Sequence, residues 1–66
     1  MDFRGWKQPD ARASDKVTVT TVEGWITIGS YNGLMREMEH AFVPPSSARA
    51  VAMALLKLAD EAEGVA

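Results

Sequence analysis

The chain has no cysteine and only one histidine, His40, among its 66 residues. Without cysteine there are no disulfides and no thiolate metal sites, and one imidazole supplies too few ligands for a structural zinc ion. A chain this short buries only about 60% of the surface that its unfolded form exposes. Chains that are marginally stable for this reason are usually stabilised by disulfides, a metal or oligomerisation. This composition excludes the first two and leaves oligomerisation. We therefore expect no cofactor, no metal and self-association.

Long apolar runs and a strong charge of one sign are also missing. The longest purely apolar run, residues 50–56, covers 7 residues, whereas a membrane span needs about 20. No basic stretch leads into an apolar segment at the start, so we expect no signal peptide, no membrane partner and a cytoplasmic location. The formal net charge of -2 argues against a dedicated nucleic-acid binder, which usually carries a basic excess.

Residues 17–30 predict a β-hairpin with strands over 17–22 and 25–30. Both segments are rich in β-branched residues, and they flank Glu23-Gly24, which suits a two-residue turn. This turn would place Val22 opposite Trp25, with one mostly threonine face and one apolar face. The apolar face would hold Val17, Val19, Thr21, Ile26 and Ile28.

Residues 31–43 fit two interpretations. Tyr31-Asn32-Gly33 predicts a turn, because asparagine and glycine tolerate positive φ. As a helix, the following segment gathers Leu34, Met35, Met38, Ala41 and Phe42 on one stripe. The short connection back to the hairpin favours a third strand over about residues 36–43. We adopt the strand and keep the helix as the alternative.

A C-terminal helix is predicted over residues 46–63. Proline is tolerated at a first helical position and serine is a preferred N-cap, so Pro44-Pro45-Ser46-Ser47 suits a helix start. Good helix formers follow, and Gly64 is the expected left-handed terminator. At 100° per residue, an arc of about 160° collects Ala48, Val51, Ala52, Leu55, Leu56, Leu58, Ala59 and Ala62.

These elements predict an α+β fold, with a two- to three-stranded antiparallel sheet packed by one C-terminal helix. The single βββα domain would cover residues 17–66, after an irregular N-terminal arm over 1–16. The two aromatic residues of the arm indicate that it docks, more readily on its own domain than on a partner. Exposed apolar residues at the hairpin tip, on the helix and in the arm form the expected interface. These residues are Trp25, Val22, Leu56, Met53, Trp6 and Phe3.

No pattern in the sequence indicates catalysis. None of the four serines lies in a nucleophile-elbow context such as Gly-x-Ser-x-Gly. The scattered glycines do not form a phosphate loop. Glu37 and Glu39 are most simply explained as solvated surface carboxylates, and His40 as a residue beside them. We therefore expect a protein that is not an enzyme.

The segment Pro45–Glu63, with its proline entry and its Ala-Asp-Glu-Ala-Glu ending, resembles the C-terminal segment of short uncharacterised proteins from actinobacteria and their bacteriophages. Gly24-Trp25 and His40-Ala-Phe-Val43 fit the strand order of that group. The resemblance implies a third strand before the prolines and a phage-type origin. It implies no activity.

The resulting hypothesis is a small protein-binding or assembly protein, self-associating as a dimer. Its concrete version is a phage-type accessory protein or host-factor modulator in the host cytoplasm. One alternative is a small DNA-binding regulator that uses the hairpin and the arm, whose basic residues are Arg4, Lys7, Arg12 and Lys16. Another alternative is a minor structural component of a virion.

Overall fold

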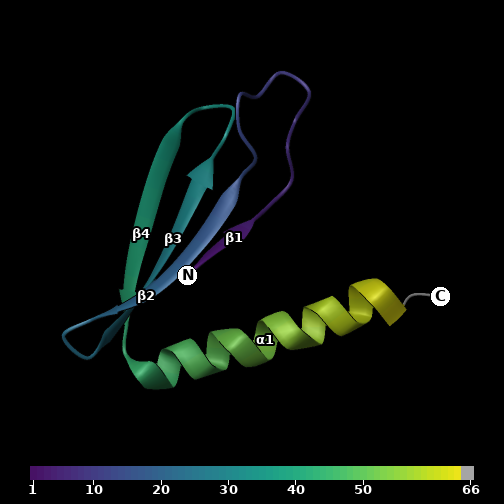
Figure 1. Cartoon of the computed structure of the whole chain (residues 1–66). Helices are drawn as coiled ribbons and strands as arrows, with labels where there is room; N and C mark the ends of the chain where they lie inside the picture. Colours follow the sequence, from purple (N-terminus) through teal and green to yellow (C-terminus); the bar gives the residue numbers. More distant parts are fainter. Residues whose placement is uncertain (65–66) are drawn as a thin grey trace.

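The computed structural model describes residues 1–64, which form a four-stranded antiparallel sheet followed by one helix (Figure 1). The elements are β1 (Asp2–Arg4), β2 (Lys16–Val22), β3 (Trp25–Asn32), β4 (Glu37–Val43) and α1 (Pro45–Gly64). Each strand pairs with the next one along the chain, so the sheet order is β1-β2-β3-β4. The predicted α+β class is confirmed, but the sheet has one strand more than the two or three expected.

The β2–β3 hairpin turns at Glu23-Gly24, as predicted. Glu23 has a φ of 49° and Gly24 a φ of 85°, the positive values of a type I′ turn, whose twist matches that of the paired strands. Val22 pairs with Trp25, and the register continues along both strands. The predicted assignment of side chains to the two faces is therefore confirmed. Both strands extend slightly beyond the predicted bounds.

The β3–β4 connection settles the ambiguous segment as a strand, and the helix alternative is wrong. The Asn32 Oδ1 accepts hydrogen bonds from the backbone N–H groups of Leu34 and Met35, each at 3.0 Å. The Asn32 carbonyl accepts from the N–H of Arg36 at 2.7 Å, and Arg36 has a φ of 57°. A left-handed residue cannot continue a helix. The turn covers residues 33–36, directly after β3 ends at Asn32, so it lies later along the chain than the predicted Tyr31-Asn32-Gly33.

The N-terminal arm contains a strand that the sequence did not indicate. β1 pairs with β2, with Phe3 opposite Val17 and Arg4 opposite Lys16. Three residues are too few to show alternation, so this strand depends on the edge that β2 offers. The two ends of the loop over residues 5–15 are joined by a hydrogen bond in which Asp15 donates its N–H to the Trp6 carbonyl at 2.9 Å. Describing the whole of residues 1–16 as irregular is therefore wrong.

Helix α1 begins one residue earlier and ends one residue later than predicted. The Pro44 carbonyl accepts the N–H of Ala48 at 3.0 Å, which makes Pro44 the N-cap and Pro45 the first helical residue. The predicted serine N-cap is therefore wrong. Gly64 is the last residue of α1 and lacks a positive φ, so its predicted left-handed role is wrong too.

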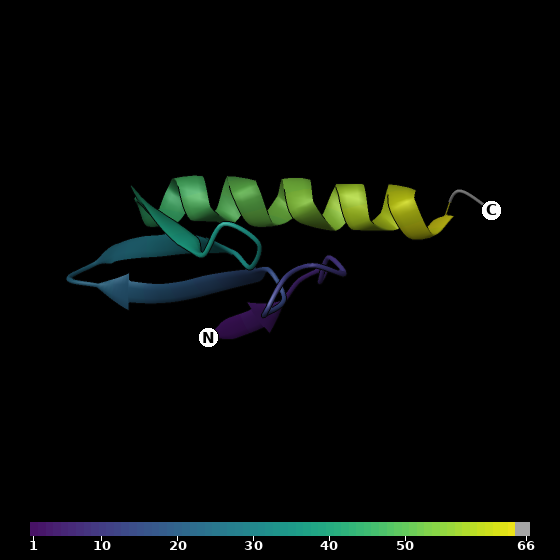
Figure 2. The same ribbon diagram turned by 90° about the horizontal axis from the view of Figure 1, so that it is seen from above.

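The helix does not pack across the sheet, contrary to expectation. It leaves the end of β4 and diverges from the strands (Figure 1), and its C-terminal half extends beyond them in the turned view (Figure 2). No residue of α1 is buried, and only Ala48 is half-buried. Among residues 1–64, Ala11 is the one buried hydrophobic residue. The chain by itself therefore has no hydrophobic core between helix and sheet.

The dimensions of the chain agree with this open arrangement. Its radius of gyration is 13.7 Å, whereas a compact domain of this length has about 10.8 Å. The principal extents of 37 × 36 × 15 Å describe a flat slab. The helix therefore diverges from the sheet at an angle, whereas a compact α+β domain would stack the two elements.

Candidate interaction surfaces

Alternating side chains give the sheet two faces of different character. We call the first the apolar face, because the register of the four strands assigns seven apolar residues to it: Phe3, Val17, Val19, Ile26, Ile28, Ala41 and Val43. The polar residues on the same face are Thr21, Ser30, Asn32, Glu37 and Glu39. The opposite face, which we call the mixed face, holds Thr18, Thr20 and Thr27 together with lysine, arginine and histidine. Its centre is Thr27, which is 5% exposed and donates its hydroxyl to the Thr20 carbonyl at 3.5 Å.

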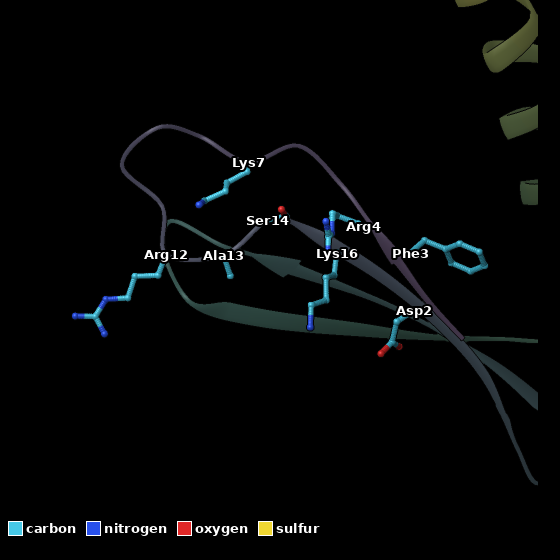
Figure 3. A pocket seen from close by; sticks show the side chains of 8 residues that line it. All are labelled: Asp2, Phe3, Arg4, Lys7, Arg12, Ala13, Ser14 and Lys16. Atoms are coloured by element: carbon cyan, nitrogen blue, oxygen red, sulfur yellow. The ribbon is translucent and has the colours of Figure 1, made fainter.

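The apolar face is directed to the side of the sheet on which α1 lies. Figure 3 shows the ring of Phe3 pointing to that side, while the side chain of Asp2 points away from it. α1 contacts β3 and β4 but not β1 or β2. Phe3 of β1 and Val17 of β2 are consequently exposed, and Ile26 and Ile28 are only half-buried. The apolar face is therefore only partly covered in the isolated chain: Phe3, Val17 and Ala41 are exposed, and the other four residues are half-buried.

Helix α1 carries a matching apolar stripe. We call the eight predicted positions the α1 stripe: Ala48, Val51, Ala52, Leu55, Leu56, Leu58, Ala59 and Ala62. Leu55 lies at the centre of the stripe, on one helical face with the half-buried Ala48, since residues seven apart share a face. Leu55 is 61% exposed and Leu56 67%. The stripe therefore starts against the sheet and runs away from it uncovered.

A second apolar patch lies at the tip of the β2–β3 hairpin, on the mixed face. Val22 and Trp25 form a cross-strand pair there and are 45% and 50% exposed. Phe42 of β4 pairs with Thr27, which places it diagonally from Trp25, within reach of an aromatic side chain. We call Val22, Trp25 and Phe42 the tip patch. Sequence reasoning missed Phe42 here because it predicted no register between this strand and the hairpin.

The structure does not gather all the predicted interface residues into one site. Val22 and Trp25 are together in the tip patch, whereas Phe3 lies on the apolar face and Leu56 on the edge of the α1 stripe. Met53 is 71% exposed and falls outside the α1 stripe by its helical angle. The 66% exposed Trp6 belongs to the loop between β1 and β2.

The arm and β2 together form an open hollow of about 520 Å³ (Figure 3). We call it the cationic hollow; its lining residues are Asp2, Phe3, Arg4, Lys7, Arg12, Ala13, Ser14 and Lys16. Four cations against one carboxylate give the lining a formal charge of +3, although the whole chain carries -2. Arg4 and Lys16 are direct cross-strand partners, and Arg12 extends away from the other cations. The concentration of positive charge suits an anion.

Within residues 1–64, no three or more His, Asp or Glu side chains are placed to hold a metal ion. No helix in that range combines the length and the apolar character that crossing a membrane requires. Comparison with family models, curated proteins and solved structures finds no match to this chain.

Proposed function

We propose that this protein is a small non-enzymatic assembly protein that self-associates through its apolar surfaces. The observation that carries the proposal is the inverted distribution of hydrophobic residues. Fifteen large hydrophobic side chains are exposed, while Ala11 is the one buried hydrophobic residue among residues 1–64. Monomers rarely leave apolar patches of more than a few hundred Å² uncovered, and larger patches mark interaction sites.

The accessible surface supports the same proposal. The chain exposes 5487 Å², whereas a compact folded monomer of this mass exposes about 4,100 Å². The excess of about 1,400 Å² is comparable to what one partner of a large protein–protein interface buries. Association with a partner would remove such surface from water.

The tip patch suits a second role, the binding of a different protein. It lies on the mixed face, apart from the apolar face and its α1 side. Tryptophan is enriched among the residues that dominate binding energy at interfaces, and Trp25 stands half exposed at the end of a rigid hairpin. With the resemblance of the helix segment, this favours an accessory protein of phage type that binds a host or phage protein.

Sedimentation equilibrium over a wide concentration range tests self-association. We expect a dimer that Leu56→Glu weakens, because the substitution places a charge on the edge of the α1 stripe. Trp25→Ala should leave the dimer intact if the tip patch serves another partner. Lys57→Glu is the matched control, since Lys57 lies opposite the α1 stripe by its helical angle. A folded monomer at every concentration would refute the proposal.

A second candidate function, nucleic-acid binding, rests on the cationic hollow. Its four cations come from β1, the following loop and the start of β2, and the exposed Trp6 lies in the same arm. Proteins that bind single strands combine a cationic groove with aromatic side chains on which bases stack. The hollow, unlike the chain as a whole, has the charge that such binding needs.

Fluorescence anisotropy of a labelled single-stranded oligonucleotide at increasing salt tests this second candidate. Binding should weaken as salt rises, with a slope that falls by about 1.4 in the double variant Arg4→Gln/Lys16→Gln. Arg49→Gln on α1 is the control and should change little, since Arg49 lies outside the hollow. Equal binding by the double variant and the control would exclude the hollow as the site.

A further inference from the structure

We propose that two copies of the chain exchange their helices, so that α1 of each copy lies across the apolar face of its partner's sheet. The proposal rests on the self-association proposed above and specifies its geometry. Two observations lead to it. The α1 stripe is exposed and the apolar face is only partly covered in one chain, and the junction between β4 and α1 holds the two apart.

The junction is short and stiff. A single residue, Pro44, separates the end of β4 at Val43 from the start of α1 at Pro45. Each proline fixes its own φ near −65°, and each disfavours the helical conformation in the residue before it. The Pro44 carbonyl is already engaged by the N–H of Ala48 at 3.0 Å. The helix therefore lacks a flexible hinge with which to fold back onto its own sheet.

The two surfaces are complementary. Half of the α1 stripe is alanine, which allows close approach, and the apolar face is dominated by β-branched side chains. A helix of 20 residues is about 30 Å long, while four strands span about 14 Å between the outer two. One helix can therefore cross all four strands of a partner.

A second copy can cover both the α1 stripe and the apolar face at once. Around a two-fold axis, the helix of one copy covers the sheet of the other and the reverse holds equally, which is the isologous arrangement expected of a dimer. Any other partner would have to supply both a helix for the sheet and an apolar face for the helix. Two copies with an excess of about 1,400 Å² each would bury about 2,800 Å², within the range of obligate homodimers.

Complementation between two single variants tests the exchange. Ile28→Lys places a charge in the centre of the apolar face, and Leu55→Glu places the opposite charge in the centre of the α1 stripe. In an exchanged homodimer of either variant both helix–sheet contacts are damaged. In the mixed dimer one helix–sheet contact is intact, and the other brings the introduced lysine against the introduced glutamate, so that opposite charges meet.

We expect each variant alone to sediment as a monomer or to lose structure, with a dimer dissociation constant raised more than about 100-fold. The equimolar mixture should recover a heterodimer, seen by native mass spectrometry, together with its circular dichroism signal. The controls are Thr20→Lys on the mixed face and Lys57→Glu opposite the α1 stripe, and both should dimerise as the unmodified chain does.

The other outcomes separate this proposal from the one on which it rests. If Ile28→Lys remains a dimer by itself, the copies associate without using the apolar face, and self-association stands while the exchange is wrong. If both variants are impaired and the mixture recovers nothing, each helix packs on its own sheet, and the exchange is again wrong. If the unmodified chain is a monomer at every concentration, both proposals fail.

Discussion

At Gly33 the chain passes so close to the start of β2 that no side chain fits. A Cβ added to Gly33 would overlap the carbonyl oxygen of Ala13. The backbone is also held in place, because Gly33 donates its N–H to the Asp15 Oδ1 at 2.9 Å. We expect Gly33→Ala to lower the free energy of unfolding by about 1–3 kcal/mol, as overpacked substitutions do. Urea unfolding followed by circular dichroism measures the change.

Gly64→Ala provides the control for this residue. A Cβ at Gly64 meets nothing within 4 Å, and alanine is the better helix former. The free energy of unfolding should therefore stay the same or rise slightly. Equal stability of Gly33→Ala and the unmodified chain would contradict the close approach of the two loops.

Glu23 is the residue least suited to its conformation in the hairpin. Its φ of 49° and the φ of 85° at Gly24 describe a turn in which asparagine is preferred at the first position. We expect Glu23→Asn to raise the free energy of unfolding by about 0.5–1 kcal/mol, since it relieves part of the cost of a left-handed residue. The denaturant midpoint should rise, and Thr20→Asn, in the extended strand, should lower it.

Among the elements, the β2–β3 hairpin was the most predictable from sequence because everything that determines it is local. The turn at residues 23–24 fixes the register, and the register fixes both faces. β1 was not predictable, since its three residues become a strand only by pairing with Lys16–Thr18. β4 was ambiguous because its apolar pattern suits both a strand and a helix. The hydrogen bonds that the Asn32 side chain accepts form a turn before β4 and so favour the strand.

The candidate surfaces were predictable from the sequence where they depend on local spacing, and not where they depend on how distant segments are placed. The membership of the α1 stripe follows from helical spacing alone, and the opposition of Val22 and Trp25 follows from the two-residue turn. The direction of α1 does not follow from local spacing, since it depends on how the two prolines join it to β4. The cationic hollow could not be predicted from the sequence either, because Arg4 comes to lie beside Lys16 only when β1 pairs with β2.

The stiffness of the β4–α1 junction can be tested by insertion. A Gly-Ser-Gly segment placed between Val43 and Pro44 would free α1 to fold back onto its own apolar face. We expect the dimer to weaken at least about tenfold in favour of a folded monomer, because lengthening a hinge removes the constraint that favours exchange. Sedimentation velocity over a range of concentrations measures the monomer fraction.

The same three residues inserted between Lys7 and Gln8 serve as the control. That position lies in the loop between β1 and β2, where insertions are well tolerated, so the dimer should persist. A dimer of unchanged affinity in the hinge variant would mean that the junction does not hold the helix away from its sheet.

The whole molecule is a flat slab in which the sheet and the helix meet at one end and diverge from there. Its few buried residues, among them Ala11, Thr27 and Gly33, lie in loops and at the centre of the sheet, not between helix and sheet. Under the proposed self-association, much of the free energy that stabilises the chain comes from contacts between copies. Stability and association would then be one equilibrium, in which folded dimer converts to unfolded monomers.

This coupling predicts that thermal stability depends on protein concentration. For a dimer that unfolds to two separate chains, each tenfold rise in concentration stabilises the folded state by about 1.4 kcal/mol. With about 130 residues in the cooperative unit, the melting temperature should rise by about 4–6 °C per tenfold increase. Differential scanning calorimetry from micromolar to millimolar concentration measures this slope. A melting temperature that stays constant over that range, in a cooperative transition, would show that one chain is stable alone and that its exposed apolar surface serves a different partner.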